Sequence, residues 1–198
     1  MAIDWRSASV PEDPFPSVSQ LIERWGHAVI SVGYGECCVP GCNCPRSSTP
    51  WTYSVGLTDA GQPELVVLGL EYGITQELVN VVAGRRRAGY LSLEDTSFTH
   101  HGIAFGIVDV PDRWVFADQS RMAAWFRHYG STGTSLPHLR IQQILWPDRF
   151  GRLPDDPACS SYIRRCQPVL RDHPMSYPKR DRVAPRAARG RSPRRRRP

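Results

Sequence analysis

Four cysteines within eight residues are the feature of this sequence best suited to chemistry. Cys37, Cys38, Cys42 and Cys44 form the pattern C-C-x3-C-x-C, in a segment rich in Gly, Pro, Asn and Ser that is typical of a loop. In a reducing compartment, closely spaced cysteines more often bind a metal or perform redox chemistry than form a disulfide framework. Zinc prefers soft thiolates in a tetrahedral arrangement. We therefore expect these four residues to form a metal site for Zn2+.

The spacing leaves the full ligand set of this site open. Ligation by adjacent cysteines is strained, so a second arrangement uses three of the four together with His27, Cys159 or Cys166. An iron–sulfur cluster and a thiol–disulfide sensor are competing interpretations of the same pattern. Cys159 and Cys166 lie seven residues apart, two turns along one helix face, where two buried structural thiols are expected.

A strongly basic C-terminal segment is the second feature. Residues 171–198 hold eleven of the 25 basic residues and two acidic ones, a local charge of +9, whereas residues 1–170 carry −3. The segment is rich in Pro and Arg and poor in large apolar residues, which predicts disorder. Mobile arginines attract phosphate backbones and stack on bases, so RNA or ribosomes are the expected partners. The expected contact residues are Arg186, Arg189, Arg191, Arg194, Arg195, Arg196 and Arg197.

Simpler explanations of the arginines stay open. The segment can be a solvated tail, a product of GC-rich coding, or a group attracted to any polyanion, including a membrane surface. Lys179 is the single lysine of the sequence, as a coding bias would produce. Arg85, Arg86 and Arg87 are expected to stabilise a helix end through its dipole on a solvated face, with RNA contact as a second role.

No pattern in the sequence indicates a catalytic site. Nucleophile-elbow, zinc-protease, phosphate-loop and dinucleotide-binding motifs are all missing. His100 and His101 are adjacent in a strand-like run and are expected on opposite faces, which argues against a paired metal site. Glu64 begins a strand, where a solvated charge is expected. Asp148 is expected to bond nearby backbone amides at a structural corner.

Hydrophobic periodicity predicts an α+β fold. We expect a single domain with a mixed or antiparallel sheet packed against two or three helices. Strands are predicted at 28–34, 51–57 and 63–70, as one or two strands within 98–110, and from 139; helices are predicted at 17–29, 74–89 and 118–130. The predicted organisation is a flexible arm at 1–19, the domain at 20–157 with the Cys-rich loop at 35–50, a short helix within 158–170, and the disordered tail at 171–198.

Two features argue against a secreted or membrane protein. No apolar stretch is long enough to span a bilayer, and the N-terminus lacks the apolar region of a secretory signal. We therefore expect a cytoplasmic protein without a membrane partner. The sequence does not predict an oligomeric state.

Several segments resemble the bacterial domain of unknown function 4262 family. They are WGHAVISVG, WTYSVGL, PELVVLGL, the helix that follows, and QQILWPDRFGRLP, over about residues 20–154. The most specific pieces are Tyr-Ser-Val-Gly-Leu at 53–57 and Trp-Pro-Asp…Gly-Arg at 146–152. The resemblance implies a fold and no assigned reaction. The Cys-rich loop and the Arg-rich tail depart from the family pattern, so the individual function is expected to reside there.

Together the Cys loop and the Arg tail predict a non-catalytic, zinc-responsive accessory protein that acts on ribosomes or RNA. The combination resembles mycobacterial zinc-responsive factors that recruit a ribosome-hibernation protein. That resemblance implies a hibernation-factor partner, the small ribosomal subunit and action under zinc starvation. Two other classes stay open: a small-molecule enzyme with the Cys loop as a structural metal or redox element, and a module that binds a dedicated protein partner.

Overall fold

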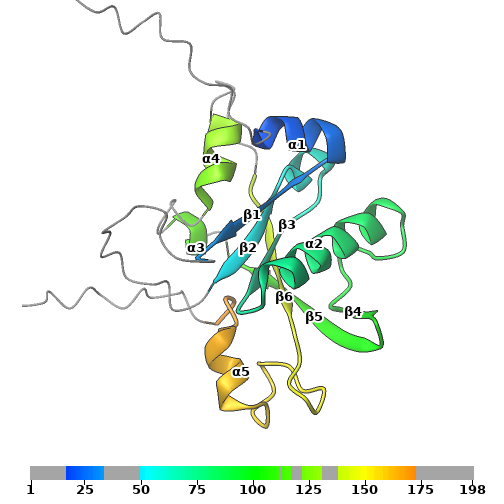
Figure 1. Ribbon diagram of the computed structural model, residues 1–198, viewed down its shortest axis with the longest axis vertical. Coiled ribbons are helices and arrows are strands. Elements are labelled where there is room, and N and C mark those ends of the chain that lie inside the picture. Colours follow the sequence, from blue (N-terminus) through cyan, green and yellow to red (C-terminus); the bar gives the residue numbers. More distant parts are fainter. Residues whose placement is uncertain (1–16, 34–49, 112, 117–121, 131–137, 173–198) are drawn as a thin grey trace, which may run out of the picture.

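The computed structural model describes residues 17–33, 50–111, 113–116, 122–130 and 138–172 (Figure 1). Its helices are α1 (Val18–Trp25), the 3-10 helix η2 (Leu57–Ala60), α2 (Tyr72–Arg87), α3 (Arg113–Phe116), α4 (Ala123–Gly130) and α5 (Ser161–Cys166). Its strands are β1 (Ala28–Val32), β2 (Trp51–Val55), β3 (Glu64–Leu68), β4 (Ser97–His100), β5 (Ile103–Val110) and β6 (Ile141–Leu145).

The strands form one mixed six-stranded sheet in the order β1-β2-β3-β6-β5-β4. The central pair, β3 and β6, is parallel, with Glu64 opposite Ile141, and the other neighbouring pairs are antiparallel. All residues of β2, β3 and β6 are buried. Strands covered on both faces read as apolar runs, which is why Leu65–Leu68 carries no polar alternation.

Helices cover both faces of the sheet, and Figure 1 shows α2 on one side with α3 and α4 on the other. On the α2 side, Leu78 and Val82 pack with Leu65, Val67 and other apolar residues of the sheet. α2 buries the helical face that its 3.6-residue periodicity predicts.

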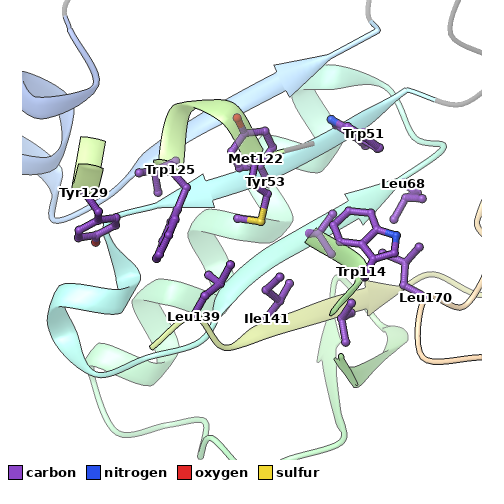
Figure 2. Packing of buried hydrophobic residues seen from close by; sticks show 13 residues of the cluster. Trp51, Tyr53, Leu68, Trp114, Met122, Trp125, Tyr129, Leu139, Ile141 and Leu170 are labelled. Atoms are coloured by element: carbon purple, nitrogen blue, oxygen red, sulfur yellow. The ribbon is translucent and has the colours of Figure 1, made fainter. Parts of the chain in front are cut away.

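Aromatic side chains fill the opposite face. Figure 2 shows Trp114 of α3 near Trp51, and Trp125 of α4 beside Tyr53 of β2. The Trp51 and Trp114 rings meet edge to face with centroids 5.8 Å apart. Three of the six tryptophans in the sequence, Trp51, Trp114 and Trp125, therefore pack on this side, where large rings bury much apolar area.

The α+β class predicted from the sequence is confirmed. The strand-like run at 98–110 is two strands, β4 and β5, joined at His101 and Gly102, and the short helix within 158–170 is α5.

No helix among the described residues is long and apolar enough to cross a membrane. The predicted domain boundaries stay predictions.

Gly69 follows β3 in the chain and packs closely against Cys166, the last residue of α5. Its φ is +76°, and a Cβ atom there would lie 2.3 Å from the carbonyl oxygen of Cys166. Only glycine meets both demands, because other L residues disfavour this backbone region and the obstructing atom belongs to the backbone.

We expect Gly69→Ala to lower the free energy of unfolding by at least about 2 kcal/mol, from backbone strain and the clash with Cys166. The melting temperature should fall by about 4–8 °C, given the size of the chain. Gly73→Ala is the matched control, because Gly73 lies in α2 with nothing within 4 Å of an added Cβ. Equal melting temperatures for the two variants would contradict the packing described for Gly69.

Candidate metal and nucleic-acid sites

The residues that the sequence singled out most strongly lie outside the described residues. They are Cys37, Cys38, Cys42, Cys44 and the arginines between 186 and 197. The zinc site in the Cys loop and the RNA contact of the tail therefore stay predictions. The described residues nevertheless fix where the Cys loop begins and ends.

The Cys loop connects two paired strands. Val32, the last residue of β1, lies opposite Trp51, the first residue of β2. Because this pairing already holds the two ends of the loop together, a metal bound within it would have less loop-closure entropy to overcome. β1 is also an edge strand of the sheet.

The alternative ligands predicted for this metal are engaged or enclosed elsewhere. His27 is buried, and its Nε2 lies 2.9 Å from Asn80 Oδ1. Cys159 is buried ahead of α5, and burial followed by the Asp148 carboxylate raises the pKa of its thiol. Cys166 is a half-buried free thiol at the end of α5. Cys159 is thus buried, as expected of a structural thiol, but it precedes α5 and Cys166 is only half-buried, so the prediction of two buried thiols on one helix face is wrong.

A different set of metal-ligating side chains converges on the surface. Glu77 of α2 and the adjacent His100 and His101 place their ligand atoms within 4.8 Å of one another. His100 Nε2 lies 2.8 Å from Glu77 Oε1, and His101 Nε2 lies 3.3 Å from the same oxygen. Hydrogen bonds from both imidazoles, His100 first, lower the pKa of Glu77.

The prediction that His100 and His101 point to opposite faces is wrong. Their ring centroids are 4.0 Å apart. The run is not continuously extended: His101 has φ +49° and Gly102 has φ +74°. Two consecutive left-handed residues turn the chain between β4 and β5, and the alternation of a strand no longer applies. Gly102 was the signal in the sequence that a turn interrupts this run.

Glu64 is fully buried, so the prediction of a solvated charge there is wrong. Its Oε1 accepts hydrogen bonds from Gly56 N (3.0 Å), Thr58 N (3.1 Å) and Thr58 Oγ1 (2.8 Å). Its Oε2 accepts one from Ser54 Oγ at 2.5 Å, and Ser54 Oγ in turn accepts from Leu65 N. Four donors replace the water that a carboxylate loses on burial.

The surroundings of Glu64 extend this network to α4. Trp125 Nε1 donates to Thr58 Oγ1 at 3.2 Å. Burial raises the pKa of Tyr129, and the carboxylates of Glu64 and Asp59 raise it further. Internal donors thus occupy both carboxylate oxygens of Glu64, and the phenol of Tyr129 is held neutral by its surroundings. The arrangement locks β2, η2 and β3 to α4.

Asp148 organises a second polar site, as the sequence predicted for this corner. Its Oδ1 accepts from Phe150 N at 2.8 Å and Arg152 N at 3.1 Å, and its Oδ2 accepts from Ser160 N at 3.2 Å. Burial alone would raise the pKa of Asp148, but these hydrogen bonds and the charge of Arg152 lower it. The tight turn that results fixes the residues between Asp148 and Arg152.

The turn presents an exposed aromatic ring that two guanidinium groups contact. Phe150 is 63% exposed, and the Cζ atoms of Arg149 and Arg152 each lie 4.6 Å from its ring centroid. We call Arg149, Phe150 and Arg152 the Phe150 tip. It borders a hollow of about 420 Å³ that is also lined by Ile163 of α5. Exposed rings with arginines are the elements that stack on bases in single-stranded nucleic acids.

The three arginines at the end of α2 do not share one role. They occupy its last turn, where cations oppose the helix dipole as predicted. Arg86, however, is buried and donates to Gln142 of β6, so the solvated face expected for it is wrong. Arg85 Nη1 donates to the carbonyl oxygen of Thr99 in β4 at 2.7 Å. Arg87 is exposed.

Comparison with known proteins gives a family and no activity. Residues 21–160 match the family described as Domain of unknown function (DUF4262), and the chain belongs to that family. No curated protein and no solved structure matches. The segments that carried the resemblance build the Glu64 network and the Asp148 turn, so both have evident roles in holding the fold.

We expect Glu64→Ala to lower the free energy of unfolding by about 3 kcal/mol or more, because it leaves the buried donors of Gly56, Thr58 and Ser54 without an acceptor. Chemical denaturation followed by tryptophan fluorescence measures the change. Glu23→Ala, at an exposed position of α1, is the matched control and should change stability by about 0.5 kcal/mol or less. A loss no larger at Glu64 than at Glu23 would contradict the role of the network.

Proposed function

We propose that this member of the DUF4262 family is a non-catalytic, zinc-responsive accessory protein that acts on ribosomes or RNA. The observation that carries the proposal is the separation of charge: residues 171–198 carry +9 while residues 1–170 carry −3. A mildly acidic domain with a strongly basic extension is suited to electrostatic attachment through the extension.

The Phe150 tip supports RNA as the polyanion. Counterion release by arginines attracts any phosphate backbone, whereas an exposed ring flanked by guanidinium groups adds stacking on unpaired bases. Arg164 and Arg165 of α5 are exposed beyond Ile163, which lines the same hollow as Phe150. In the proposed arrangement the tail provides long-range attraction and the tip provides a short-range contact with a base.

The Cys loop would supply the zinc response. Thiolates of Cys37, Cys38, Cys42 and Cys44 would hold Zn2+ in a loop whose ends the β1–β2 pairing joins. Bound zinc would order the loop and cover a surface that the zinc-free chain offers to a partner. The resemblance to zinc-responsive factors makes a ribosome-hibernation protein on the small subunit the partner of this proposal.

Binding of the full chain to single-stranded poly-U RNA should weaken steeply with salt. Replacing the seven arginines between 186 and 197 by glutamine should reduce the slope of log affinity against log salt by as much as about 5.

Phe150→Ala should cost about 1–3 kcal/mol of affinity with little change in slope, because it removes stacking and no charge. Fluorescence anisotropy at several salt concentrations measures both effects, and ribosome cosedimentation repeats the comparison on the proposed target.

The matched control for the tip is Tyr90→Ala, since Tyr90 is an aromatic residue that is 84% exposed between α2 and β4. The affinity of the Tyr90→Ala variant for RNA should equal that of the parent chain. Salt-insensitive binding that survives the glutamine substitutions would overturn electrostatic attachment by the tail. Equal losses for Phe150→Ala and Tyr90→Ala would overturn the contact at the tip.

Protein purified reduced and without an affinity metal should contain about one tightly bound zinc per chain by mass spectrometry, and Cys42→Ser/Cys44→Ser should lose it. Recruitment of the hibernation factor to ribosomes should increase when zinc is chelated from the parent chain and should be insensitive to chelation in this variant. Cys166→Ser is the control, because Cys166 is a free thiol at the end of α5. A parent chain without zinc, or recruitment unaffected by chelation, would overturn the zinc response.

A further inference from the structure

Glu77, His100 and His101 converge although they come from two separate elements. Glu77 lies within α2, whereas His100 ends β4 and His101 begins the turn to β5. His101 and Glu77 are exposed, with side-chain exposures of 74% and 51%, and His100 is 16% exposed. The cluster is thus open to solvent on one side and anchored by His100 on the other.

The turn geometry is what aims both imidazoles at one carboxylate. His100 lies opposite Ile103, which leaves His101 and Gly102 as a two-residue turn with both φ angles positive. Glycine, asparagine and aspartate adopt this conformation at low cost, while other residues incur about 1–2 kcal/mol. The chain places a histidine at this costly position, and the result is a pair of rings 4.0 Å apart.

The donor atoms have the types and the spacing that a transition metal requires. Zinc binds imidazole nitrogen and carboxylate oxygen at about 2.0–2.2 Å, so two ligands of one tetrahedral ion lie about 3.4 Å apart. The distances from Glu77 Oε1 to the Nε2 atoms of His100 and His101 are 2.8 and 3.3 Å. Metal entry would therefore need Glu77 Oε1 to move about 0.6 Å away from His100 Nε2 and about 0.1 Å away from His101 Nε2.

The hydrogen bonds within the cluster show which atoms a metal would occupy. Each imidazole donates its Nε2 proton in a hydrogen bond to Glu77 Oε1. For a cation to bind at these nitrogens, each neutral ring would have to carry its proton on Nδ1 instead, which leaves Nε2 free as a ligand. Arg85 is the nearby positive charge on α2, and its guanidinium is bound to the carbonyl oxygen of Thr99.

We propose that Glu77, His100 and His101 form a surface site for Zn2+ that ties α2 to the β4–β5 turn. Three protein ligands leave the fourth tetrahedral position to water or to a side chain of a partner, as in zinc sites that exchange their fourth ligand. This site is chemically distinct from the Cys loop, because it uses nitrogen and oxygen donors. It goes beyond the proposed function, and neither inference requires the other.

The test uses the full chain with Cys37, Cys38, Cys42 and Cys44 replaced by serine, stripped of metal with a chelator and titrated with Zn2+ by calorimetry. We expect about one zinc per chain in this background. His101→Ala and Glu77→Gln should each weaken that binding at least tenfold, because losing even an outer-shell partner costs about 10–100-fold. His138→Ala is the matched control: His138 is exposed and precedes β6, at the opposite end of the sheet from the β4–β5 turn.

A second measurement needs no substitution at the site. Zinc should shift the Nε2 resonances of His100 and His101 in nitrogen NMR spectra and leave those of His138 unchanged. No zinc uptake by the folded serine background, or equal affinity in His101→Ala and His138→Ala, would overturn the proposal. Because the background lacks the Cys loop ligands, this result is independent of whether the loop binds zinc in the parent chain.

Discussion

The central strands β2, β3 and β6 are buried on both faces, and the remainder of the structure has to accommodate this constraint. A strand covered on both sides has no water for its polar side chains, so each must find a partner inside the protein. On β6, Gln143 bonds to the backbone of Pro168 and Leu170, which fixes the segment after α5 across the sheet. Its neighbour Gln142 points to the other face and accepts from Arg86 of α2. Glu64 of β3, which also accepts from Ser54 of β2, likewise fixes η2 by accepting hydrogen bonds from Thr58. The polar groups of the core thus determine where the covering elements attach.

This constraint separates the parts of the sequence that hold the fold from the parts that are available for chemistry. Tyr-Ser-Val-Gly-Leu at 53–57 supplies the donors of Ser54 and Gly56 to Glu64, and the Asp148 segment is occupied by its own turn. Both motifs are satisfied by internal hydrogen bonds. The side chains that reach solvent with unusual geometry lie instead in connections: the β4–β5 turn and the Phe150 tip. This division agrees with the general tendency of binding and catalytic residues to lie on loops that a rigid scaffold positions.

Sequence periodicity was sufficient for the α+β class, for α2 and for the apolar strand β3, since each depends on a pattern longer than four residues. It failed where one residue changes the local geometry. The run at 98–110 is compatible with one strand or two, and an extended backbone at His100 and His101 predicts opposite faces, whereas the turn at His101 and Gly102 brings both rings together. Glu64 and Arg86 were assigned to solvent because charged side chains usually are, and their burial depends on partners ten or more residues away in sequence: Ser54 and Gln142. Only the tertiary structure brings those partners together.

The two proposed zinc sites belong to opposite edges of the sheet. The Cys loop follows β1 and the Glu77 cluster lies at the end of β4, and these are the two edge strands. Five strand spacings of about 4.8 Å separate these two edge strands by about 24 Å. The donor atoms of the two proposed sites differ as well, and thiolates hold zinc more tightly than an exposed imidazole–carboxylate set. Such a pair would fill in sequence as zinc rises, with the Cys loop first, and the exposed site would change occupancy in a range where the loop is already saturated.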